Sequence, residues 1–583
     1  MSKQTELIPK FNNFRDLLEN SIKSYGDNIA YKYKKNINKK PVEYVEKTYE
    51  NVGEDIKALS EAFLNYEKPI KRIALIGNNR YEWVISYFAT VCSGMVIAPM
   101  DKMLPENEII SLIERSGVDV AIFDKKYLDT FKKLKNSNSN QLHTLICMDN
   151  IKDKDIIKFE EILEEGRKFR ESNSNKIKKY EDITVDYNAM SIMLFTSGTT
   201  DLSKIVMLSQ KNICNNVYGY QNHFKMLPTD TLLSFLPIHH TFESSITIIY
   251  GFYCGATVAF CDGLRYIADN LKEYHVSIFV AVPLVLETMY KKINKGIKEQ
   301  GKEKLINTMI KVSNGLLKMH IDVRKKIFKA IIDKFGGKLR IILYGGAALD
   351  KDTIVGFNNF GVDSIQGYGL TETSPVLVAE SETKHKPGSA GYPLDEVELK
   401  IFEPDKDGVG EILAKGPNIM LGYYNDEEKT KDAFEDGWFR TGDYGYIDNE
   451  GFLFITGRKK DIIVLRNGKN IYPQELEFLI NKLDYVQESM VYSREASKTD
   501  TLLAAKIVYD KEIMEKNFPD KSVNDYKNII WNDIKEINKN LADYKHIKKI
   551  TITDVPMEKT TTQKIKRYQE IKKTDIWILK INN

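Results

Sequence analysis

The chain has 583 residues, of which 42% are hydrophobic, 11% aromatic and 29% charged, an ordinary composition for a globular protein. This composition excludes a mainly disordered chain, a collagen-like chain and a small disulfide-held domain. The 85 Lys and Arg residues nearly balance the 82 Asp and Glu residues, and the net charge of +3 gives no indication of nucleic-acid binding. Because domains commonly have about 100–200 residues, we expect two or more structural units.

Five cysteines are scattered along the chain, with no CxxC pair and no His/Cys cluster at zinc-ligand spacing. They are expected to be reduced and mostly buried thiols. The amino terminus, MSKQTELIPKFNNF, lacks an apolar core of signal-peptide length, so the expected location is the cytoplasm.

Two long uncharged runs have to be tested as membrane spans, namely 84–100 (VISYFATVCSGMVIAPM) and 244–261 (SSITIIYGFYCGATVAFC). A span needs about 20 predominantly apolar residues, and both runs are shorter and contain a glycine. Each is better explained as a buried helix, a glycine stop and a short β-branched strand. The shared layout of VCSGMVIAP and FYCGATVAF suggests two similar α/β halves.

Strands and helices then alternate along the chain. After helical segments and a lysine-rich hairpin near 30–49, the strands IALIG, MVIAP and VDVAIF alternate with helices from Arg72 onward, which predicts a parallel sheet with helices on both faces. Residues 126–186, rich in Lys, Asn and Glu, are predicted to be a surface excursion. The strand IMLF and then LLSFLP, TVAFC, SIFVAVP, RIILYGG and SIQGYG continue the pattern.

The segment 291–340 holds 15 Lys and Arg residues but four Asp and Glu residues, a net charge of +11. It is predicted to be helical, with apolar residues at a spacing of three or four (Leu305, Met309, Val312, Leu316). One interpretation is a solvated helical face. The other is a peripheral patch that attracts anionic lipid at the inner membrane face or a polyphosphate ligand, since each basic residue near an anionic surface contributes about 1 kcal/mol.

After Tyr392 the pattern changes to short strands and turns, typical of a small antiparallel β unit, and the last part is α+β with lysine-rich helices. The predicted fold class is therefore α/β: a large N-terminal domain, 1–459, of parallel or mixed sheets with helices plus the small antiparallel β unit, and a small α+β C-terminal domain, 460–583.

The loop 196–204 reads TSGTTDLSK, follows a strand and is dense in hydroxyl groups. Backbone N–H groups and hydroxyls at such a turn can bind phosphate oxygens, and the terminal lysine adds a positive charge. It is not a Walker loop, because GxxxxGK[ST] is absent. An ordinary polar loop is the alternative. The candidate phosphate contacts are Thr196, Ser197, Gly198, Thr199, Thr200 and Lys204.

Five motifs in a fixed order carry a resemblance: TSGTTxxxK, YGLTE at 368–372, GWFRTGDYGYIDNEGFLFITGRKKD at 437–461, NGKNIYPQELE at 467–477 and TTTQKIKR at 560–567. Together they resemble the adenylate-forming (ANL) superfamily, over essentially the whole chain. The HHTFE segment and the basic helical insertion are most similar to long-chain fatty acyl-CoA synthetases. The resemblance implies a mobile C-terminal domain.

The resemblance implies a fatty-acid ligase that uses ATP and coenzyme A as co-substrates and Mg²⁺ as a cofactor. The acid attacks the α-phosphate of ATP to give an acyl-adenylate and pyrophosphate, and a thiol then displaces AMP. Negative charge develops at phosphorus, so cations and oriented donors are required. Lys564, in TTTQKIKR, is implied as the adenylation lysine; without the motif it would be a solvated charge.

Further roles are carried over motif by motif. Glu372 resembles the magnesium-binding glutamate, with Thr371 beside it reaching the α-phosphate, although both could instead cap a helix. Asp443 resembles the acceptor of both ribose hydroxyls, a role that suits the two oxygens of a carboxylate. Arg458 would contact the same ribose or form a surface salt bridge. Lys460 takes the hinge position, and Gly468 would line the pantetheine tunnel.

Small residues end two strands in this region. Gly346 and Ala347 end one strand and Gln366, Tyr368 and Gly369 the next, where a purine and an acyl chain could approach the backbone. Tyr368 could stack on adenine or be a core tyrosine.

In LPIHHTFE, His240 is favoured over His239 as the histidine near the substrate carboxylate. The loop departs from the usual TSGTTGxPKG at Asp201, Ser203 and Ile205. Asp201 could repel the β,γ-phosphates or help to hold the metal.

Three functions are compatible with this sequence. The first is a long-chain fatty acid–CoA ligase. The second is an adenylating enzyme that loads the pantetheine thiol of an acyl carrier protein, which would have to be a partner because no carrier domain is present. The third is a nucleotide-binding, membrane-associated protein with reduced catalysis, which the altered loop and the basic segment keep open.

Overall fold

The computed structural model describes residues 10–35, 41–137, 139–196, 203–346, 349–465, 470–497, 500–559 and 565–573. These residues form two compact units. The first takes its described residues from 10–398 and 414–439, and the second from 399–413 and 440–573. The predicted α/β class and the division into a large and a small part are confirmed; the boundary at Lys460 stays a prediction.

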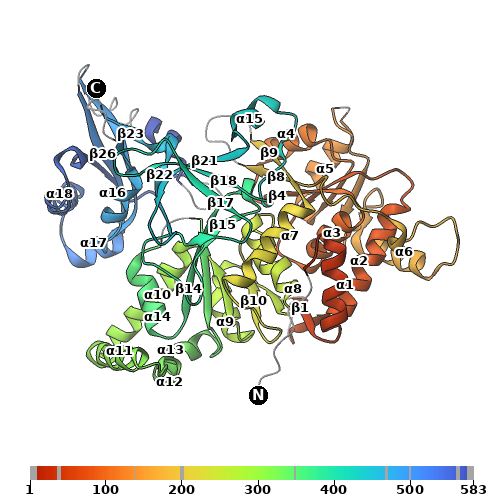
Figure 1. Cartoon of the computed structure of the whole chain (residues 1–583), viewed down its shortest axis with the longest axis horizontal. Helices are drawn as coiled ribbons and strands as arrows, with labels where there is room; N and C mark the ends of the chain where they lie inside the picture. The colour runs from red at the N-terminus through yellow and green to blue at the C-terminus, as the bar shows by residue number, and fades with distance from the viewer. Residues whose placement is uncertain are drawn as a thin grey trace. The chain divides into compact units, whose positions relative to one another are not determined.

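The first unit contains two mixed sheets flanked by helices (Figure 1). The eight-stranded sheet has the order β19-β9-β8-β4-β3-β5-β6-β7. Its strands are β3 (Arg72–Ile76), β4 (Val96–Met100), β5 (Val120–Phe123), β6 (Thr144–Cys147), β7 (Ile157–Lys158), β8 (Met190–Thr196), β9 (Lys204–Ser209) and β19 (Gly422–Tyr423).

The nine-stranded sheet has the order β16-β15-β14-β13-β12-β10-β11-β1-β2, with parallel pairing from β14 to β1. Its strands are β1 (Ile29–Lys35), β2 (Glu43–Thr48), β10 (Thr231–Ser234), β11 (Thr257–Phe260), β12 (Ile278–Ala281), β13 (Ile341–Gly345), β14 (Asp363–Gly369), β15 (Val376–Ala379) and β16 (Tyr392–Pro393).

The two uncharged runs fold as predicted. Helix α3 (Tyr81–Cys92) leads through Gly94 into β4, and the helical segment Glu243–Tyr253 leads through Gly255 into β11. Both glycines have positive φ, +72° and +77°, a conformation that strongly favours glycine and lets the chain reverse from helix to strand. In the part of the chain that the structure describes, no helix combines the length and the apolar character needed to cross a bilayer.

The predicted surface excursion over 126–186 is wrong in part. Strand β6 is a fully buried member of the eight-stranded sheet, and α6 (Phe159–Glu171) packs closely on α2 (Tyr49–Leu64). A Cβ atom on Gly166 would lie 2.0 Å from the carbonyl oxygen of Ala58. The four-residue run TLIC is too short to stand out from its Lys- and Asn-rich surroundings.

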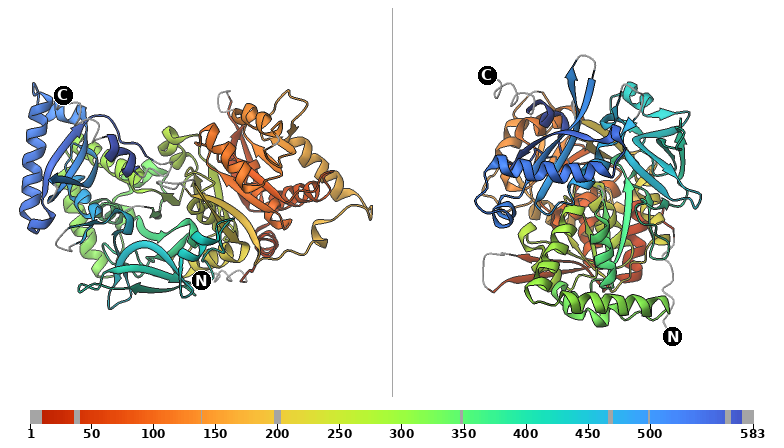
Figure 2. Two further views of the ribbon diagram at one scale, coloured as in Figure 1. Left: turned by 90° about the horizontal axis from the view of Figure 1, so that it is seen from above. Right: turned by 90° about the vertical axis from the view of Figure 1, so that its left-hand side faces the viewer.

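The basic segment folds as helices α10 (Pro283–Glu299), α11 (Glu303–Lys318), α12 (Arg324–Ile327) and α13 (Lys329–Ile332). They run along the periphery of the first unit, in light green in Figures 1 and 2. Ser313 is the one side chain of α11 that is buried, so this helix is packed on one narrow face and solvated on the rest.

The second unit combines an antiparallel sheet, a mixed three-stranded sheet and a helical layer. Strands β17 (Glu398–Phe402), β18 (Gly410–Lys415), β21 (Trp438–Ile447) and β22 (Leu453–Arg458) belong to the predicted small antiparallel sheet. A three-stranded sheet of β25 (Val486–Ser497), β26 (Asp500–Tyr509) and β27 (Ile547–Thr553) packs with α16 (Pro473–Ile480) and α18 (Val523–Lys539).

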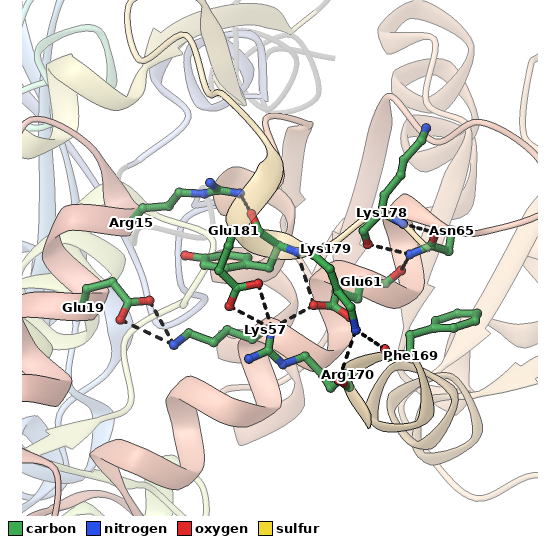
Figure 3. A network of polar contacts seen from close by, with 11 residues as sticks. Arg15, Glu19, Lys57, Glu61, Asn65, Phe169, Arg170, Lys178, Lys179 and Glu181 are labelled. Atoms are coloured by element: carbon green, nitrogen blue, oxygen red, sulfur yellow. Dashed lines mark hydrogen bonds and ion pairs between the residues drawn. The ribbon is translucent and has the colours of Figure 1, made fainter. Parts of the chain in front are cut away.

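A polar network fastens the segment that precedes β8 (Figure 3). The carboxylate of Glu61 on α2 is fully buried and accepts hydrogen bonds from Arg170 Nη1 at 2.8 Å and from the backbone N–H of Tyr180 at 3.2 Å. The Asn65 side chain pairs with the backbone of Lys178 in both directions, at 2.8 and 2.9 Å. The segment 178–180, which precedes β8, is therefore anchored to α2.

We expect Glu61→Gln to lower the free energy of unfolding of the first unit by about 1–3 kcal/mol, because the partly buried Arg170 and Lys179 lose the charge of the buried carboxylate that they contact. Urea unfolding followed by circular dichroism measures the effect. Glu54→Gln, on an exposed position of the same helix, is the matched control and should change the value by less than about 0.5 kcal/mol. Equal, small effects of both substitutions would contradict a stabilising role of the network.

Candidate functional site

The residues on either side of the hydroxyl-rich loop are held by strand pairing. Thr196 at the end of β8 pairs with Lys204 at the start of β9. Arg115 Nη2 donates a hydrogen bond of 2.5 Å to the carbonyl oxygen of Ser203. Ser197, Gly198, Thr199, Thr200 and Asp201 lie outside the described residues, so their predicted phosphate contacts stay predictions.

Tyr423 lies between Lys204 and Glu372. Its hydroxyl donates a hydrogen bond of 3.0 Å to Glu372 Oε1, and Lys204 Nζ lies over its ring, 4.4 Å from the centroid. The ring is buried, with 6% of its surface exposed, and this burial together with the adjacent Glu372 carboxylate raises the pKa of the phenol. The phenol therefore stays protonated and remains a donor.

Thr371 and Glu372 lie on the short 3₁₀ turn Thr371–Thr373 that follows β14. The hydroxyl that bonds the turn's own backbone belongs to Thr373, which accepts from Leu370 N at 2.9 Å. The backbone oxygen of Glu372 accepts from Met420 N at 2.9 Å, which fixes the residue to the segment before β19. The Glu372 carboxylate thus does not cap the turn and faces Tyr423 instead.

The ends of β13 and β14 bring small residues together. Gly345 pairs with Gly367, and Tyr344 OH donates a hydrogen bond of 3.2 Å to Gln366 Oε1. Gly346 has φ of +85°, and a Cβ atom there would meet no described atom within 4 Å.

Two further positions at these strand ends bear on the predictions. At Gly369 a Cβ would lie 1.8 Å from the Pro375 carbonyl oxygen, so this glycine is required by local packing. Tyr368 is only partly buried, unlike a core tyrosine. Ala347 lies outside the described residues.

The two adjacent histidines have different surroundings. His239 is partly buried, with 14% of its side chain exposed, and its Nε2 lies 3.8 Å from Asp101 Oδ2; loss of hydration lowers the pKa of His239, although Asp101 opposes this shift. His240 is also partly buried, and its Nδ1 accepts a hydrogen bond of 3.3 Å from the backbone N–H of Phe242. The neutral His240 ring therefore carries its proton on Nε2. The Phe242 ring lies 3.6 Å from a Cβ placed on Gly345, so the histidine turn packs on the end of β13.

Glu243, which follows this turn, was not singled out by the sequence reasoning. Its carboxyl group is fully buried and receives hydrogen bonds from Ser234 Oγ at 2.6 Å and Thr247 Oγ1 at 2.9 Å. Asn79 Nδ2 in turn donates to Ser234 Oγ at 2.9 Å. Burial raises the pKa of Glu243 from 4.5 to about 8, so at neutral pH a protonated carboxyl group joins the end of β10 to the histidine turn.

The two predicted ribose residues belong to the second unit and contact each other. Asp443 on β21 pairs across the strands with Arg458 on β22, and Arg458 Nε lies 3.0 Å from Asp443 Oδ1. Asp443 is buried, with 3% of its surface exposed. The arginine therefore fixes the carboxylate whose oxygens are predicted to accept from the ribose hydroxyls.

The predicted hinge lies on the 3₁₀ turn Lys459–Asp461, and both neighbours of Lys460 are anchored. Lys459 Nζ lies 3.0 Å from Glu411 Oε2, and Asp461 Oδ2 lies 3.6 Å from Arg567 Nε. Gly468 lies outside the described residues. Lys460 therefore lies between two residues, Lys459 and Asp461, whose side chains are held by ion pairs.

Lys564 also lies outside the described residues, but the residues on both sides of it are fixed. Lys559 pairs with Ile565 in an antiparallel bridge, and Lys559 Nζ lies 2.6 Å from Glu488 Oε1. Arg567 donates hydrogen bonds to Glu477 Oε2 at 2.5 Å and to the carbonyl oxygen of Val491 at 3.2 Å. The segment that carries the predicted adenylation lysine thus begins and ends at anchored residues.

A metal in the first unit would be held by few protein ligands. Among the residues that the structure describes, no group of three or more His, Cys, Asp and Glu side chains could hold a metal ion. The partly exposed Glu372 carboxylate offers the oxygen donor that Mg²⁺ prefers, with phosphate oxygens and water as its remaining ligands. Glu372 as magnesium ligand fits the structure and stays a prediction.

Comparison with known proteins places these residues in context. The family described as AMP-binding enzyme matches residues 18–424, and the family described as AMP-binding enzyme C-terminal domain matches residues 460–580. A chloroplastic long-chain-fatty-acid–[acyl-carrier-protein] ligase of Arabidopsis thaliana is 26% identical, with 89% of this chain and 79% of that protein covered. Long-chain-fatty-acid–CoA ligase 5 of Rattus norvegicus is 30% identical, with 70% of this chain and 62% of that protein covered.

Among solved structures, the complex of an anthranilate CoA ligase with anthranoyl-AMP matches with a TM-score of 0.75 at 19% identity. The match covers 99% of this chain and 100% of that chain, and at this identity it shows a shared fold.

The raised pKa of Glu243 predicts a pH dependence of stability. The folded protein holds this proton up to about pH 8, whereas the unfolded chain releases it near the ordinary value of 4.5. The contribution of the group therefore falls as pH rises, by about 1.4 kcal/mol per pH unit between pH 5.5 and 7.5. Relative to wild type, Glu243→Gln should gain stability with this slope in urea unfolding at several pH values. A difference independent of pH would contradict the buried protonated carboxyl group.

Proposed function

We propose the following function for this chain, which belongs to the AMP-binding enzyme family: it activates a long-chain fatty acid with ATP to an acyl-adenylate, releasing pyrophosphate, and transfers the acyl group to coenzyme A, releasing AMP. The observation that carries the proposal is the placement of Lys204, Glu372 and the open backbone at Gly346 at the strand ends of one unit. The long-chain-fatty-acid ligases among its relatives support the substrate class.

The first step joins two anions. A fatty-acid carboxylate oxygen attacks the α-phosphorus, the P–O bond to pyrophosphate breaks, and negative charge develops at the phosphoryl oxygens. Lys204 and the hydroxyl-rich loop would bind the phosphates, Thr371 would donate to the α-phosphate, and Glu372 would hold Mg²⁺, which supplies charge neutralisation when bound. The ammonium group of Lys564 would lie at the reacting oxygens.

The nucleoside and the acid would be held by the other predicted residues. Asp443, oriented by Arg458, would accept hydrogen bonds from the ribose hydroxyls. His240, with its proton on Nε2, would donate to the substrate carboxylate. The adenine would lie against the strand ends at Gly346 and Gln366, with the partly exposed Tyr368 stacked on it.

In the second step a thiol displaces AMP from the acyl-adenylate. The coenzyme A thiolate attacks the acyl carbonyl carbon, and the bond from carbonyl carbon to the bridging oxygen breaks, which releases AMP. The pantetheine thiol of an acyl carrier protein is the alternative nucleophile, favoured by the relative named as a ligase of the acyl-carrier protein. The same chemistry serves both acceptors.

ATP–pyrophosphate exchange across a panel of carboxylic acids tests the function. Exchange should depend on a long-chain acid such as palmitate, and addition of coenzyme A should yield one acyl thioester for each AMP. A thioester formed only with an acyl carrier protein would select the second acceptor. ATP binding without exchange for any acid would contradict the proposed catalysis and select a nucleotide-binding protein.

Lys564→Ala should reduce adenylate formation by about a thousandfold or more, because two anions must then approach without the bridging cation. Thioester formation from chemically prepared palmitoyl-adenylate should stay within about threefold of wild type, since that step has no triphosphate. Rapid-quench assays of the two steps separate them, with Lys566→Ala as a matched neighbouring control. Equal loss in both steps would contradict the assigned role.

We also propose that α11 attaches the protein peripherally to an anionic lipid surface. Leu305, Val312 and Met319 recur every seven residues, and their exposed fractions of 55%, 53% and 68% are high for apolar side chains. The exposed Lys304, Lys311 and Lys318 run beside them with the same spacing. Because seven residues are nearly two helical turns, the two rows are parallel along one side of the helix. An apolar row beside a cationic row is typical of a helix that lies in a membrane interface.

The triple substitution Lys304→Glu, Lys311→Glu and Lys318→Glu should abolish sedimentation with vesicles containing 30% phosphatidylglycerol, because attraction of about 1 kcal/mol per lysine becomes repulsion. The matched control makes the same charge change at Lys516, Lys521 and Lys527, which are also exposed, and should sediment like wild type. Pure phosphatidylcholine vesicles should bind neither the wild-type protein nor either variant. Equal sedimentation of both variants with the anionic vesicles would rule out α11 as the attachment site.

A further inference from the structure

Two oppositely charged side chains with predicted phosphate-related roles contact one tyrosine, Lys204 at the face of its ring and Glu372 at its hydroxyl. Lys204 Nζ is 4.4 Å from the ring centroid of Tyr423, and the phenol hydroxyl is 3.0 Å from Glu372 Oε1. In the described part of the chain no ion pair joins Lys204 to Glu372, and the Glu372 carboxylate has no hydrogen-bond donor besides this phenol. Tyr423 is therefore a neutral group in contact with both charges, and Asp426 is a carboxylate that interacts with Lys204 through space.

Such a separation matters in a site for a metal-bound triphosphate. A lysine and a glutamate within reach of each other would pair, and ATP with its metal would then have to break that pair before binding. A cation over an aromatic face and a carboxylate that accepts from a neutral phenol are both held in place without losing their charge.

The backbone fixes the ring in this position. Tyr423 pairs with Val206 in β9, two residues after Lys204, and its backbone N–H donates to Thr430 Oγ1 at 2.9 Å. The preceding Gly422 has φ of +139°, and a Cβ there would lie 2.8 Å from Thr430 Cγ2. The ring is thus attached to the same strand as the lysine, and the 3₁₀ turn of Glu372 is tied to the residue at 420.

We propose that Tyr423 is a positioning residue that keeps Lys204 available for the phosphates and orients the Glu372 carboxylate for Mg²⁺. This inference rests on the proposed function. The phenol occupies Oε1, so Oε2 is the oxygen left for the metal. The sequence LGYYNDEE contains no pattern that predicts a role for this tyrosine. Its contact with Lys204 depends on the pairing of β19 with β9.

Tyr423→Phe tests the orienting hydroxyl. The ring under Lys204 remains, so the Mg²⁺ concentration that gives half-maximal pyrophosphate exchange should rise about fivefold to tenfold, and saturating Mg²⁺ should restore the rate to within about threefold of wild type. Calorimetric affinity for Mg·ATP should fall by a similar factor, whereas affinity for AMP without metal should not change.

Tyr423→Leu tests the separation of charges. Without the ring, Lys204 and Glu372 can pair, so affinity for ATP should fall about tenfold or more and should not be restored by Mg²⁺. Tyr424→Phe is the matched control, because Tyr424 OH also forms a hydrogen bond with a charged side chain, accepting from Arg72 Nη1 at 2.7 Å, and its ring also lies under a cation, the guanidinium of Arg72. This control should leave the Mg²⁺ dependence unchanged.

An unchanged Mg²⁺ dependence of Tyr423→Phe would overturn the inference, and so would equal losses of AMP and Mg·ATP affinity, which indicate a merely structural role. Failure of the proposed function gives a different result, namely no pyrophosphate exchange by the wild-type protein. In that case the calorimetric comparison of Mg·ATP with AMP still decides the role of Tyr423.

Discussion

A carboxylate and a triphosphate repel each other, and a site that joins them has to supply positive charge that its own acidic residues do not neutralise. In the first unit we propose that Tyr423 serves this condition, because its ring contacts Lys204 and its hydroxyl contacts Glu372. The ring is buried and fixed by strand pairing, so both charges are held without an ion pair between them. The predicted roles of the phosphate loop, the metal ligand and the α-phosphate donor all depend on this arrangement.

In the second unit the charged residues at the predicted ribose and hinge positions form direct ion pairs. Asp443 and Arg458 form a direct ion pair, Lys459 contacts Glu411, and Arg567 joins Glu477 and Asp461. These ion pairs fix the Asp443 carboxylate, which is predicted to accept from the ribose hydroxyls, and both ends of the turn Lys459–Asp461. Arg567, three residues after the predicted adenylation lysine, contacts Asp461 on the predicted hinge turn and Glu477 on α16.

Much of this architecture could be predicted from the sequence because the signals were local. The glycine stops before β4 and β11 and the alternation of strands and helices follow from short patterns. Strand β6 was missed because four apolar residues are too few to be distinguished from a polar segment. Tyr423, Glu61 and Glu243 were missed because their roles depend on partners 51, 119 or 9 residues away in the sequence, which no single pattern contains. The two histidines of HHTFE could be separated only when Asp101 and Phe242 were placed beside them.

The central chemical claim is that the carboxylate oxygen of the fatty acid attacks the α-phosphorus of ATP. It is tested most directly with palmitate labelled with ¹⁸O in both carboxylate oxygens, incubated with ATP, Mg²⁺ and coenzyme A. Mass spectrometry of the products should find one ¹⁸O atom in AMP, one in the acyl thioester and none in pyrophosphate. Unlabelled AMP, or label recovered in inorganic phosphate together with ADP, would contradict the account.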